Sequence, residues 1–433
     1  MQATKMVEEE KNTNLIYIVP DLLEEIFLRL PSKSILKFKT VSKQWRSILE
    51  SKMFVERRMN VKKTRRIIAA YNCDCGDRPR IIRQARLDEW DDEVIVYIHF
   101  RDARPSMNCD ARPLMTCDGL VCIAEPESII VLNPSTGQLL RFPSAPDPVS
   151  SRFINGSYKL VLLLLSGEEV DFIRGNWVMG FGRDKVTGSF KVIKMCSFPM
   201  EGGCDVLDVE SGEWTNLRLY PFVVGVSRKS VCVSGSIYWL SCASYKIGGG
   251  SKILALDLHT QESHFVSVPD KWVSRYTHIA NLEDRLTIAT TRAATILEIC
   301  SMDAHQEIWS KTYSIALAAL DDLNLGHSRC FMSFTPLAVS KHGNLLFHNN
   351  NQWLFIYYPE THEIRCLSSD TSVVSSYVEN LVPLRSEFGH QPPDPDSNKI
   401  STSSCSFLTK HPDPRTSVYH SNYSLKLSNI CLW

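Results

Sequence analysis

Residues 19–31 read Val-Pro-Asp-Leu-Leu-Glu-Glu-Ile-Phe-Leu-Arg-Leu-Pro, and this stretch predicts a short amphipathic helix. Its apolar residues recur at spacings of one, three, one and three, which places them on one helical face; they are Leu22, Leu23, Ile26, Phe27 and Leu30. Acidic residues near the start favour the helix because they face the positive end of its dipole. Pro31 disfavours helical backbone at the preceding residue, so we expect the helix to end there.

Two further short helices are expected downstream. Ser32 is placed to cap the second helix, and Ser42 is placed to cap the third. Their apolar residues are Ile35, Leu36, Phe38, Trp45, Ile48 and Leu49. Helices of two to three turns are marginal in isolation, and a module of about 40 residues has little interior. The apolar faces therefore exceed what such a bundle buries by itself, and we expect a partner to cover them.

These residues resemble a plant F-box. Residues 19–31 resemble its opening, and residues 32–39 (Ser-Lys-Ser-Ile-Leu-Lys-Phe-Lys) and 41–48 (Val-Ser-Lys-Gln-Trp-Arg-Ser-Ile) are similar to its remainder. Ser42 stands where cysteine is common, and Val19 where leucine is frequent. The resemblance implies a three-helix F-box over residues 15–60 that docks a Skp-type adaptor and, through it, a cullin scaffold. The adaptor contacts that it implies are Pro20, Leu22, Leu23, Ile26, Pro31, Ile35, Leu36, Val41 and Trp45.

Residues 33–66 are strongly basic, with twelve basic residues and two acidic ones. Such a run is typical of a nuclear address or of a nucleic-acid patch. No aromatic residue follows Phe54 within it to stack on bases, which argues against nucleic acid. We expect the charge to face an acidic partner, as the resemblance implies for the adaptor. The alternative interpretation of the segment is a small helical cap packed on the domain that follows.

Beyond about residue 63 the helical period gives way to short strands. One unit recurs: an apolar strand, a turn of Asn or Asp followed by Thr, Ser or Gly, and a second strand. Asn and Asp bond the local backbone in such turns and Gly supplies positive φ, so each unit predicts a hairpin. The units cover residues 129–140, 205–214 and 253–261, with weaker copies at 297–309 and 355–366.

The spacing of these units predicts a propeller. Asp208, Asp257 and Asp303 are separated by 49 and 46 residues, which is the length of a four-stranded blade. The interval from Asn133 to Asp208 is 75 residues, which we attribute to an insertion around residues 146–175. The predicted fold class is thus multidomain, α followed by all-β, with a β-propeller-like (kelch-like) larger domain. A hairpin-rich β-sandwich is the alternative.

The same part of the chain resembles the plant F-box-associated domain. Its motifs stand in the family's order: Cys-Asp-Gly-Leu-Val-Cys at 117–122, Asn-Pro-Ser-Thr-Gly at 133–137, Gly-Phe-Gly-Arg-Asp at 180–184, Phe-Lys-Val at 190–192, Gly-Ser-Ile-Tyr-Trp at 235–239 and Tyr-Val-Glu-Asn-Leu-Val at 377–382. Phe190 stands where tyrosine is more frequent. The resemblance implies a domain over residues 61–384 that binds the protein to be ubiquitinated through loops at one end of its sheets. It indicates no individual substrate-binding residue.

The chain ends and the composition indicate which segments are disordered and which locations and partners are expected. Residues 1–14 are polar and lack a secretion signal, and residues 385–433 are rich in Ser, Thr and Pro, so we expect both to be disordered. The most apolar run, residues 160–165, is too short to cross a membrane. Fourteen cysteines without a secretion signal predict reduced thiols and a cytoplasmic or nuclear location. A net charge of zero gives no reason to expect nucleic acid or a membrane surface as partner.

The sequence predicts no metal site, phosphate loop, metalloprotease motif or ligand-stacking tryptophan. The one-residue gap between Cys73 and Cys75 falls outside zinc spacing, so no metal site is expected there or with Cys109, Cys117 and Cys122. Residues 248–252 (Gly-Gly-Gly-Ser-Lys) lack the residue order of a phosphate loop. The histidines at 259, 264 and 362 lack metalloprotease spacing. Five tryptophans are expected to pack in the blades rather than to stack on ligands: Trp177, Trp239, Trp272, Trp309 and Trp353.

The sequence therefore predicts a non-catalytic subunit of an SCF-type ubiquitin ligase with no cofactor. Its β domain is expected to recognise an unidentified protein and to hold it near the ubiquitin carrier, so that catalysis acts by proximity. The alternative, from another class, is a propeller-type binding module for a carbohydrate or a small ligand. A propeller enzyme is a third hypothesis, but no metal or nucleophile constellation supports it.

Overall fold

The computed structural model describes residues 18–384, apart from gaps at 62–64, 72–79, 87–93, 100–114, 125–127, 145–176, 197–202, 219–228, 242–251, 275, 293–294, 304–306, 319, 321–332, 341, 350–352 and 369–371. The chain divides into two compact units, unit 1 over residues 1–62 and unit 2 over residues 63–433, close to the boundary expected at residue 60. The ends expected to be disordered and the insertion around 146–175 lie outside the described residues.

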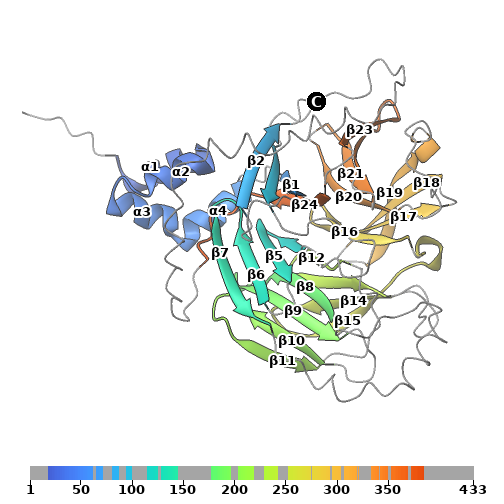
Figure 1. Ribbon diagram of the computed structural model, residues 1–433, viewed down its shortest axis with the longest axis horizontal. Coiled ribbons are helices and arrows are strands. Elements are labelled where there is room, and N and C mark those ends of the chain that lie inside the picture. Colours follow the sequence, from blue (N-terminus) through green and yellow to red (C-terminus); the bar gives the residue numbers. More distant parts are fainter. Residues whose placement is uncertain are drawn as a thin grey trace, which may run out of the picture. The chain divides into compact units, whose positions relative to one another are not determined.

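The described part of unit 1 contains four helices (Figure 1): α1 (Pro20–Arg29), α2 (Ser32–Phe38), α3 (Lys43–Glu50) and α4 (Lys52–Val61). The first three are the predicted helices. The expectation of three helices was wrong, because α4 was missed. Its apolar residues do not recur at the helical period, so it shows no apolar stripe, and it is held by a few deeply buried side chains such as Phe54 and Val55.

The helix ends confirm two of the three predicted boundary signals. Helix α1 ends at Arg29, and Leu30 before Pro31 is extended. The Ser42 side chain caps α3 by accepting a hydrogen bond from the Trp45 backbone N–H at 3.1 Å. The predicted cap at Ser32 was wrong: Pro31, with its extended backbone, is the N-cap of α2, and Ser32 is already the first helical residue.

The core of unit 1 is a small aromatic cluster closed by α4. Phe27 on α1 meets Trp45 on α3 edge to face, with ring centroids 5.0 Å apart. Helix α4 is tied to α1 by two adjacent arginines. Arg57 pairs with Glu24 at 3.1 Å, and the buried Arg58 donates to the Leu28 carbonyl at 3.2 Å. Part of the basic run is therefore used inside the unit.

The described part of unit 2 contains six four-stranded sheets, numbered here as blades 1–6. Blade 1 contains β1 (Arg65–Tyr71), β2 (Arg80–Arg86), β3 (Val94–His99) and β24 (Ser372–Val378). Blade 2 contains β4 (Met115–Cys117), β5 (Leu120–Ala124), β6 (Ser128–Asn133) and β7 (Gln138–Pro143). Blade 3 contains β8 (Trp177–Arg183), β9 (Phe190–Cys196), β10 (Gly203–Asp208) and β11 (Trp214–Arg218).

The remaining blades follow in chain order. Blade 4 contains β12 (Val231–Val233), β13 (Ser236–Leu240), β14 (Lys252–Asp257) and β15 (Ser263–Ser267). Blade 5 contains β16 (His278–Leu282), β17 (Arg285–Arg292), β18 (Ile296–Asp303) and β19 (Ile308–Ala316). Blade 6 contains β20 (Phe334–Val339), β21 (Leu345–Asn349), β22 (Leu354–Tyr358) and β23 (Glu363–Ser368).

The sheets form a closed propeller (Figure 1). In blades 2–6 the four strands pair antiparallel in chain order, and the first strand of each blade contacts the first strand of the next. In blade 1 the C-terminal β24 pairs antiparallel with β1, which pairs parallel with β3. Strand β24 contacts both β20 and β4, so it completes the inner ring. The propeller prediction is confirmed, and the alternative β-sandwich is not the fold.

All five predicted hairpins join the third and fourth strands of blades 2–6. In three of them the anchor carboxylate or amide accepts a backbone N–H two residues on, at 2.8–2.9 Å, as predicted; the anchors are Asn133, Asp208 and Asp257. The turn position with positive φ is glycine at Gly137 and Gly212 only. In the other three turns Gln261, Glu307 and His362 adopt it, and two of these turns belong to the weaker copies at 297–309 and 355–366.

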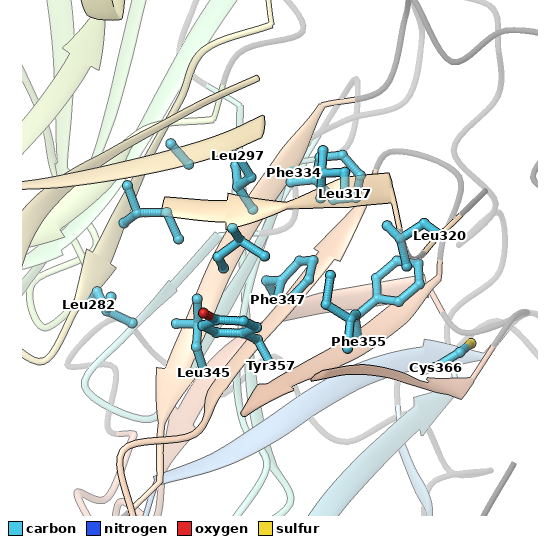
Figure 2. Close-up of a cluster of buried hydrophobic side chains, with 14 residues drawn as sticks. Leu282, Leu297, Leu317, Leu320, Phe334, Leu345, Phe347, Phe355, Tyr357 and Cys366 are labelled. Carbon is cyan, nitrogen blue, oxygen red and sulfur yellow. The ribbon is translucent and has the colours of Figure 1, made fainter. Parts of the chain in front are cut away.

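Neighbouring blades share their apolar faces. Figure 2 shows the cluster between blades 5 and 6, where Leu282 and Leu297 of blade 5 lie with aromatic residues of blade 6. The rings of Phe347 and Phe355 stack with centroids 5.4 Å apart, and Phe334 meets Phe347 edge to face at 5.8 Å. Burial on both faces of a blade explains why its middle strands are almost continuously apolar in sequence.

Three tryptophans link successive blades through their indole N–H groups. Trp214 donates to the Pro143 carbonyl of blade 2 at 3.1 Å, and Trp309 donates to the Ser267 carbonyl of blade 4 at 3.0 Å. The fully buried Trp239 donates to the Met179 carbonyl of blade 3 at 3.1 Å. The packing role predicted for Trp239 and Trp309 is confirmed.

The motif at 180–184 and the motif at 235–239 pack on each other. A Cβ at Gly180 would lie 2.4 Å from Cζ2 of Trp239, so blades 3 and 4 approach closely only because residue 180 has no side chain. At the end of the same motif, Oδ1 of Asp184 accepts the N–H of Val186 at 2.8 Å. Burial raises the pKa of the Asp184 carboxyl, but hydrogen bonds from Thr187, Val186 and His259 outweigh it and lower the pKa to about 2.

The motif at 377–382 fastens the ring to blade 2. The Asn380 side chain donates to the Asp118 carbonyl at 2.7 Å, and its backbone N–H donates to Ser135 Oγ at 2.9 Å. Asn133 donates to the Val382 carbonyl at 3.0 Å. We call these five residues the closing latch. Gly119 (φ 82°) lies beneath it, where a Cβ would come within 2.1 Å of the chain at Val378.

We predict that Gly180→Ala lowers the free energy of unfolding by about 2 kcal/mol, because the new methyl group overpacks against the indole of Trp239. Trp239→Phe costs about 2–3 kcal/mol on its own, since it removes ring volume and leaves the Met179 carbonyl without its donor. Urea unfolding of the single and double variants checks the contact. The double variant is expected to lose at least about 1 kcal/mol less than the sum of the single variants. If the losses in free energy of unfolding were additive, residues 180 and 239 would not be in the proposed contact.

We also predict that Asn380→Ala lowers the free energy of unfolding by about 2–4 kcal/mol, because two hydrogen bonds of a fully buried side chain are lost. The matched control is Asn216→Ala, which removes an exposed asparagine bonded to Asp205 on an outer strand. It is expected to change stability by less than about 0.5 kcal/mol. Thermal melting of both variants measures the difference, and equal losses would show that the latch does not close the ring.

Candidate adaptor-docking surface

Unit 1 leaves a set of large apolar side chains exposed. Leu22, Ile26 and Val41 are 54%, 42% and 59% exposed, and Ile18 and Val19 are 39% and 50% exposed. We call these five residues the docking surface. Val19, Leu22 and Ile26 follow each other at spacings of three and four residues, so they lie on one face of the first turns of α1. Apolar side chains gathered in this way mark an interaction site.

Helix α1 is apolar on two faces. The other face carries Leu23, Phe27 and Leu28, which are at most 5% exposed and form part of the core of unit 1. A helix of ten residues in a small bundle has one face for the bundle, so the second apolar face is available for another molecule. The prediction that the apolar residues exceed what the bundle buries is therefore confirmed for α1.

The predicted contact positions divide into three groups. Pro20, Leu22, Ile26, Pro31 and Val41 are exposed, and Leu36 and Trp45 are half-buried. Leu23 and Ile35 are only 5% and 0% exposed, so the structure places them in the core of unit 1 rather than on its surface. Sequence reasoning missed Ile18 and Val19 because they precede the helix, where the apolar period gives no signal.

Positive charge accompanies the docking surface along the chain. Lys43 and Arg46 follow Val41 and are exposed, as are Lys37 and Lys52. Arg46 also donates to the Lys39 carbonyl at 3.1 Å, which ties α3 to the end of α2. The exposed cations favour an acidic partner, whereas Arg57 and Arg58 serve the unit itself.

The two ends of the propeller differ in the length of their connections. At the end that we call the turn end, short hairpins join the first strand to the second and the third to the fourth in blades 2–6. At the opposite end, blades are joined by longer connections such as residues 144–176, 219–230 and 317–333, most of which lie outside the described residues. Long loops on a rigid scaffold are where proteins place binding residues.

The candidate chemical groups that fall in the described residues have structural partners. His259 Nδ1 lies 3.3 Å from Asp184, and His362 Nδ1 lies 2.8 Å from the Tyr357 hydroxyl. Among the described residues, no group of three or more His, Cys, Asp or Glu is arranged to hold a metal ion. Cys73, Cys75 and Cys109 lie outside them, as does most of 248–252. No helix in the described part of the chain is long and apolar enough to span a membrane.

Comparison with known families agrees with this architecture. Residues 18–57 match the F-box domain, and residues 91–372 match the F-box associated beta propeller domain.

Three curated proteins of Arabidopsis thaliana are similar over nearly the whole chain. An F-box/LRR-repeat protein is 50% identical over 91% of this chain and 89% of its own. An F-box protein is 49% identical over 92% of this chain and 93% of its own. An F-box/kelch-repeat protein is 48% identical over 92% of both chains. With a helical F-box, a propeller of four-stranded blades and relatives of this similarity, the chain belongs to the family of F-box proteins with an F-box-associated β-propeller domain.

Proposed function

We propose that this protein is the substrate-recognition subunit of an SCF-type ubiquitin ligase. Unit 1 docks a Skp-type adaptor and, through it, a cullin scaffold, and the propeller binds the protein to be ubiquitinated. The protein has no catalytic step of its own. The observation that carries the proposal is the docking surface, an apolar face that the F-box unit leaves exposed.

The size of the docking surface supports a specific contact. Burying a large apolar side chain fully is worth about 1.5–3 kcal/mol relative to leaving it exposed. The five residues of the docking surface are 39–59% exposed, so each retains a substantial part of that free energy for a partner. Exposed lysines that stand near Val41 in the sequence, such as Lys37 and Lys43, add long-range attraction to an acidic adaptor.

The propeller is suited to binding the protein to be ubiquitinated because it is a rigid frame. Its ring is closed by β24 and the closing latch, and its turn end is held by hydrogen bonds within the hairpins. A target held on such a frame is presented at a constant position, which is what proximity catalysis requires. We assign target selection to the opposite end, where the long connections gather.

The alternative of a carbohydrate-binding module gains no support from the three tryptophans that link the described blades. Ligand stacking needs an exposed indole face, but Trp239 is fully buried, and Trp214 and Trp309 are half-buried and donate to backbone carbonyls of the preceding blade. The rings act as links between blades.

We predict that the double variant Pro20→Ala, Leu22→Ala weakens binding of a Skp-type adaptor at least about tenfold, because it truncates Leu22 of the docking surface and the exposed proline two positions before it. Purified full-length protein and adaptor are compared by calorimetry. Circular dichroism is expected to be unchanged, since both residues are exposed.

The matched control is Met53→Ala, which removes an 80% exposed apolar side chain on α4 outside the predicted contacts. It is expected to leave the affinity within about twofold. Undiminished adaptor binding by the Pro20→Ala, Leu22→Ala variant would contradict the assignment of the docking surface, and an equal loss with Met53→Ala would assign the contact to a different face.

We further predict that replacing residues 146–175 by a short Gly-Ser linker leaves adaptor binding intact but changes the proteins captured from cells with the proteasome blocked. The control is Glu210→Ala with Glu213→Ala, two exposed residues of the turn end, for which the captured proteins are expected to stay the same. Quantitative mass spectrometry of both variants measures the outcome. Loss of targets from the turn-end variant alone would place selection at the turn end and would contradict the assignment to the long connections.

A further inference from the structure

Two cysteine thiols from different blades meet inside the propeller. Cys117 ends β4 in blade 2, and Cys232 lies in the middle of β12 in blade 4. The Ser230 hydroxyl, two residues before Cys232, donates a hydrogen bond to the sulfur of Met115, two residues before Cys117, at 3.8 Å, and Cys232 packs against the same buried cluster that contains Cys117. Both are free thiols in this structure. They are 115 positions apart in the sequence, and the ring brings them together because β4 and β12 both contact β8.

The backbone of blade 3 creates the room for this contact. Gly182 on β8 lies beside the pair, and a Cβ there would lie 3.0 Å from the sulfur of Cys232. The absence of a side chain at residue 182 thus lets β12 approach β8 closely enough for its thiol to reach the thiol of β4.

The two thiols are not equivalent. Cys117 is 8% exposed, whereas Cys232 is half-buried and is therefore the more accessible of the two. Donation from the Cys117 thiol, helped by the N–H groups of Arg183 and Gly235, lowers the pKa of Cys232. The same hydrogen bond, together with burial, raises the pKa of Cys117. Cys232 is the more accessible thiol and the one whose pKa is lowered, and thiolates are the form that reacts with oxidants.

We propose that Cys117 and Cys232 form a reversible disulfide under oxidising conditions, which makes this pair a thiol modification site of the propeller. The oxidant is a hydroperoxide such as hydrogen peroxide. The property goes beyond the proposed ligase function and does not depend on it.

The reaction balances in two steps. The Cys232 thiolate attacks one peroxide oxygen, the O–O bond breaks, and the products are a sulfenic acid at Cys232 and hydroxide. The Cys117 sulfur then attacks the sulfenic sulfur, an S–S bond forms, the S–O bond breaks, and water leaves with the Cys117 proton. The two sulfurs together lose two electrons, and the peroxide is reduced to two molecules of water. A thiol reductant reverses the link.

The link would act at the closing latch. Asp118, the residue after Cys117, accepts the hydrogen bond of Asn380, and its carboxylate lies 3.7 Å from Nη1 of Arg183. A disulfide between β4 and β12 therefore joins blades 2 and 4 across blade 3, directly beside the point where the ring is fastened. We expect the oxidised propeller to unfold at a higher temperature than the reduced one, because the link closes a long loop of the unfolded chain.

The test exposes the folded full-length protein to hydrogen peroxide, blocks the remaining thiols with iodoacetamide, and maps linked peptides by mass spectrometry. The expected result is one linked pair, Cys117 with Cys232, with a mass lower by two hydrogen atoms, abolished by a thiol reductant. Cys117→Ser and Cys232→Ser are each expected to lose it, whereas Cys366→Ser, which removes a buried thiol from blade 6, is expected to keep it. Melting curves of all variants before oxidation establish that they are folded.

Protein unfolded in urea during oxidation provides the second arm. The selective pairing depends on the folded ring, so the link is expected to become one among many in urea. Folded protein in which Cys232 is oxidised to sulfinic acid while Cys117 remains a free thiol would overturn the proposal. So would a folded protein in which neither residue reacts, or a pairing that is no more selective when folded than in urea.

Discussion

The structure depends on the pairing of the C-terminal strand β24 with the N-terminal strand β1. The other blades are continuous segments of chain, but blade 1 is built from both ends of the propeller sequence. Strand β24 supplies its inner position and contacts the first strands of blades 2 and 6. An open ring would expose the apolar faces of two blades, so this pairing keeps every blade covered on both sides. The hydrogen bonds of Asn380 and Asn133 reinforce the same junction.

The motifs typical of the F-box-associated domain are explained by contacts between blades rather than by ligand chemistry. Gly119 allows the chain at Val378 to pass over the β4–β5 turn, and Gly180 allows Trp239 to lie against β8. In both places a methyl group would collide with a neighbour that is distant in sequence. Residues that look like a recognition signature along the chain are thus the places where blades come closest. Their spacing reflects ring geometry, which leaves the exposed loops free to vary with the target.

Packing limits account for two other features of the protein, one in each unit. Unit 1 is too small to bury all of its apolar residues, so α1 keeps a second apolar face outward while Phe27 and Leu28 form the core. The propeller brings thiols from blades 2 and 4 into contact although a complete blade separates them in the chain. In unit 1 the core has too little volume to bury every apolar residue. In the propeller the first strands of neighbouring blades pack closely around the axis, which brings side chains of different blades together.

The sequence by itself determined the local structure of this protein. The hairpins at Asn133, Asp208 and Asp257, the cap at Ser42 and the end of α1 before Pro31 depend on neighbours within a few residues, so they were predictable. Only the tertiary structure decided which face of a helix is covered. Leu22 and Leu23 belong to the same apolar pattern, yet Leu22 is 54% exposed and Leu23 is 5% exposed. It also decided that the ring closes through β24 and that α4, held by Phe54 and Arg58, forms although its sequence has no apolar stripe. These outcomes depend on contacts between residues far apart in the chain, which no local pattern records.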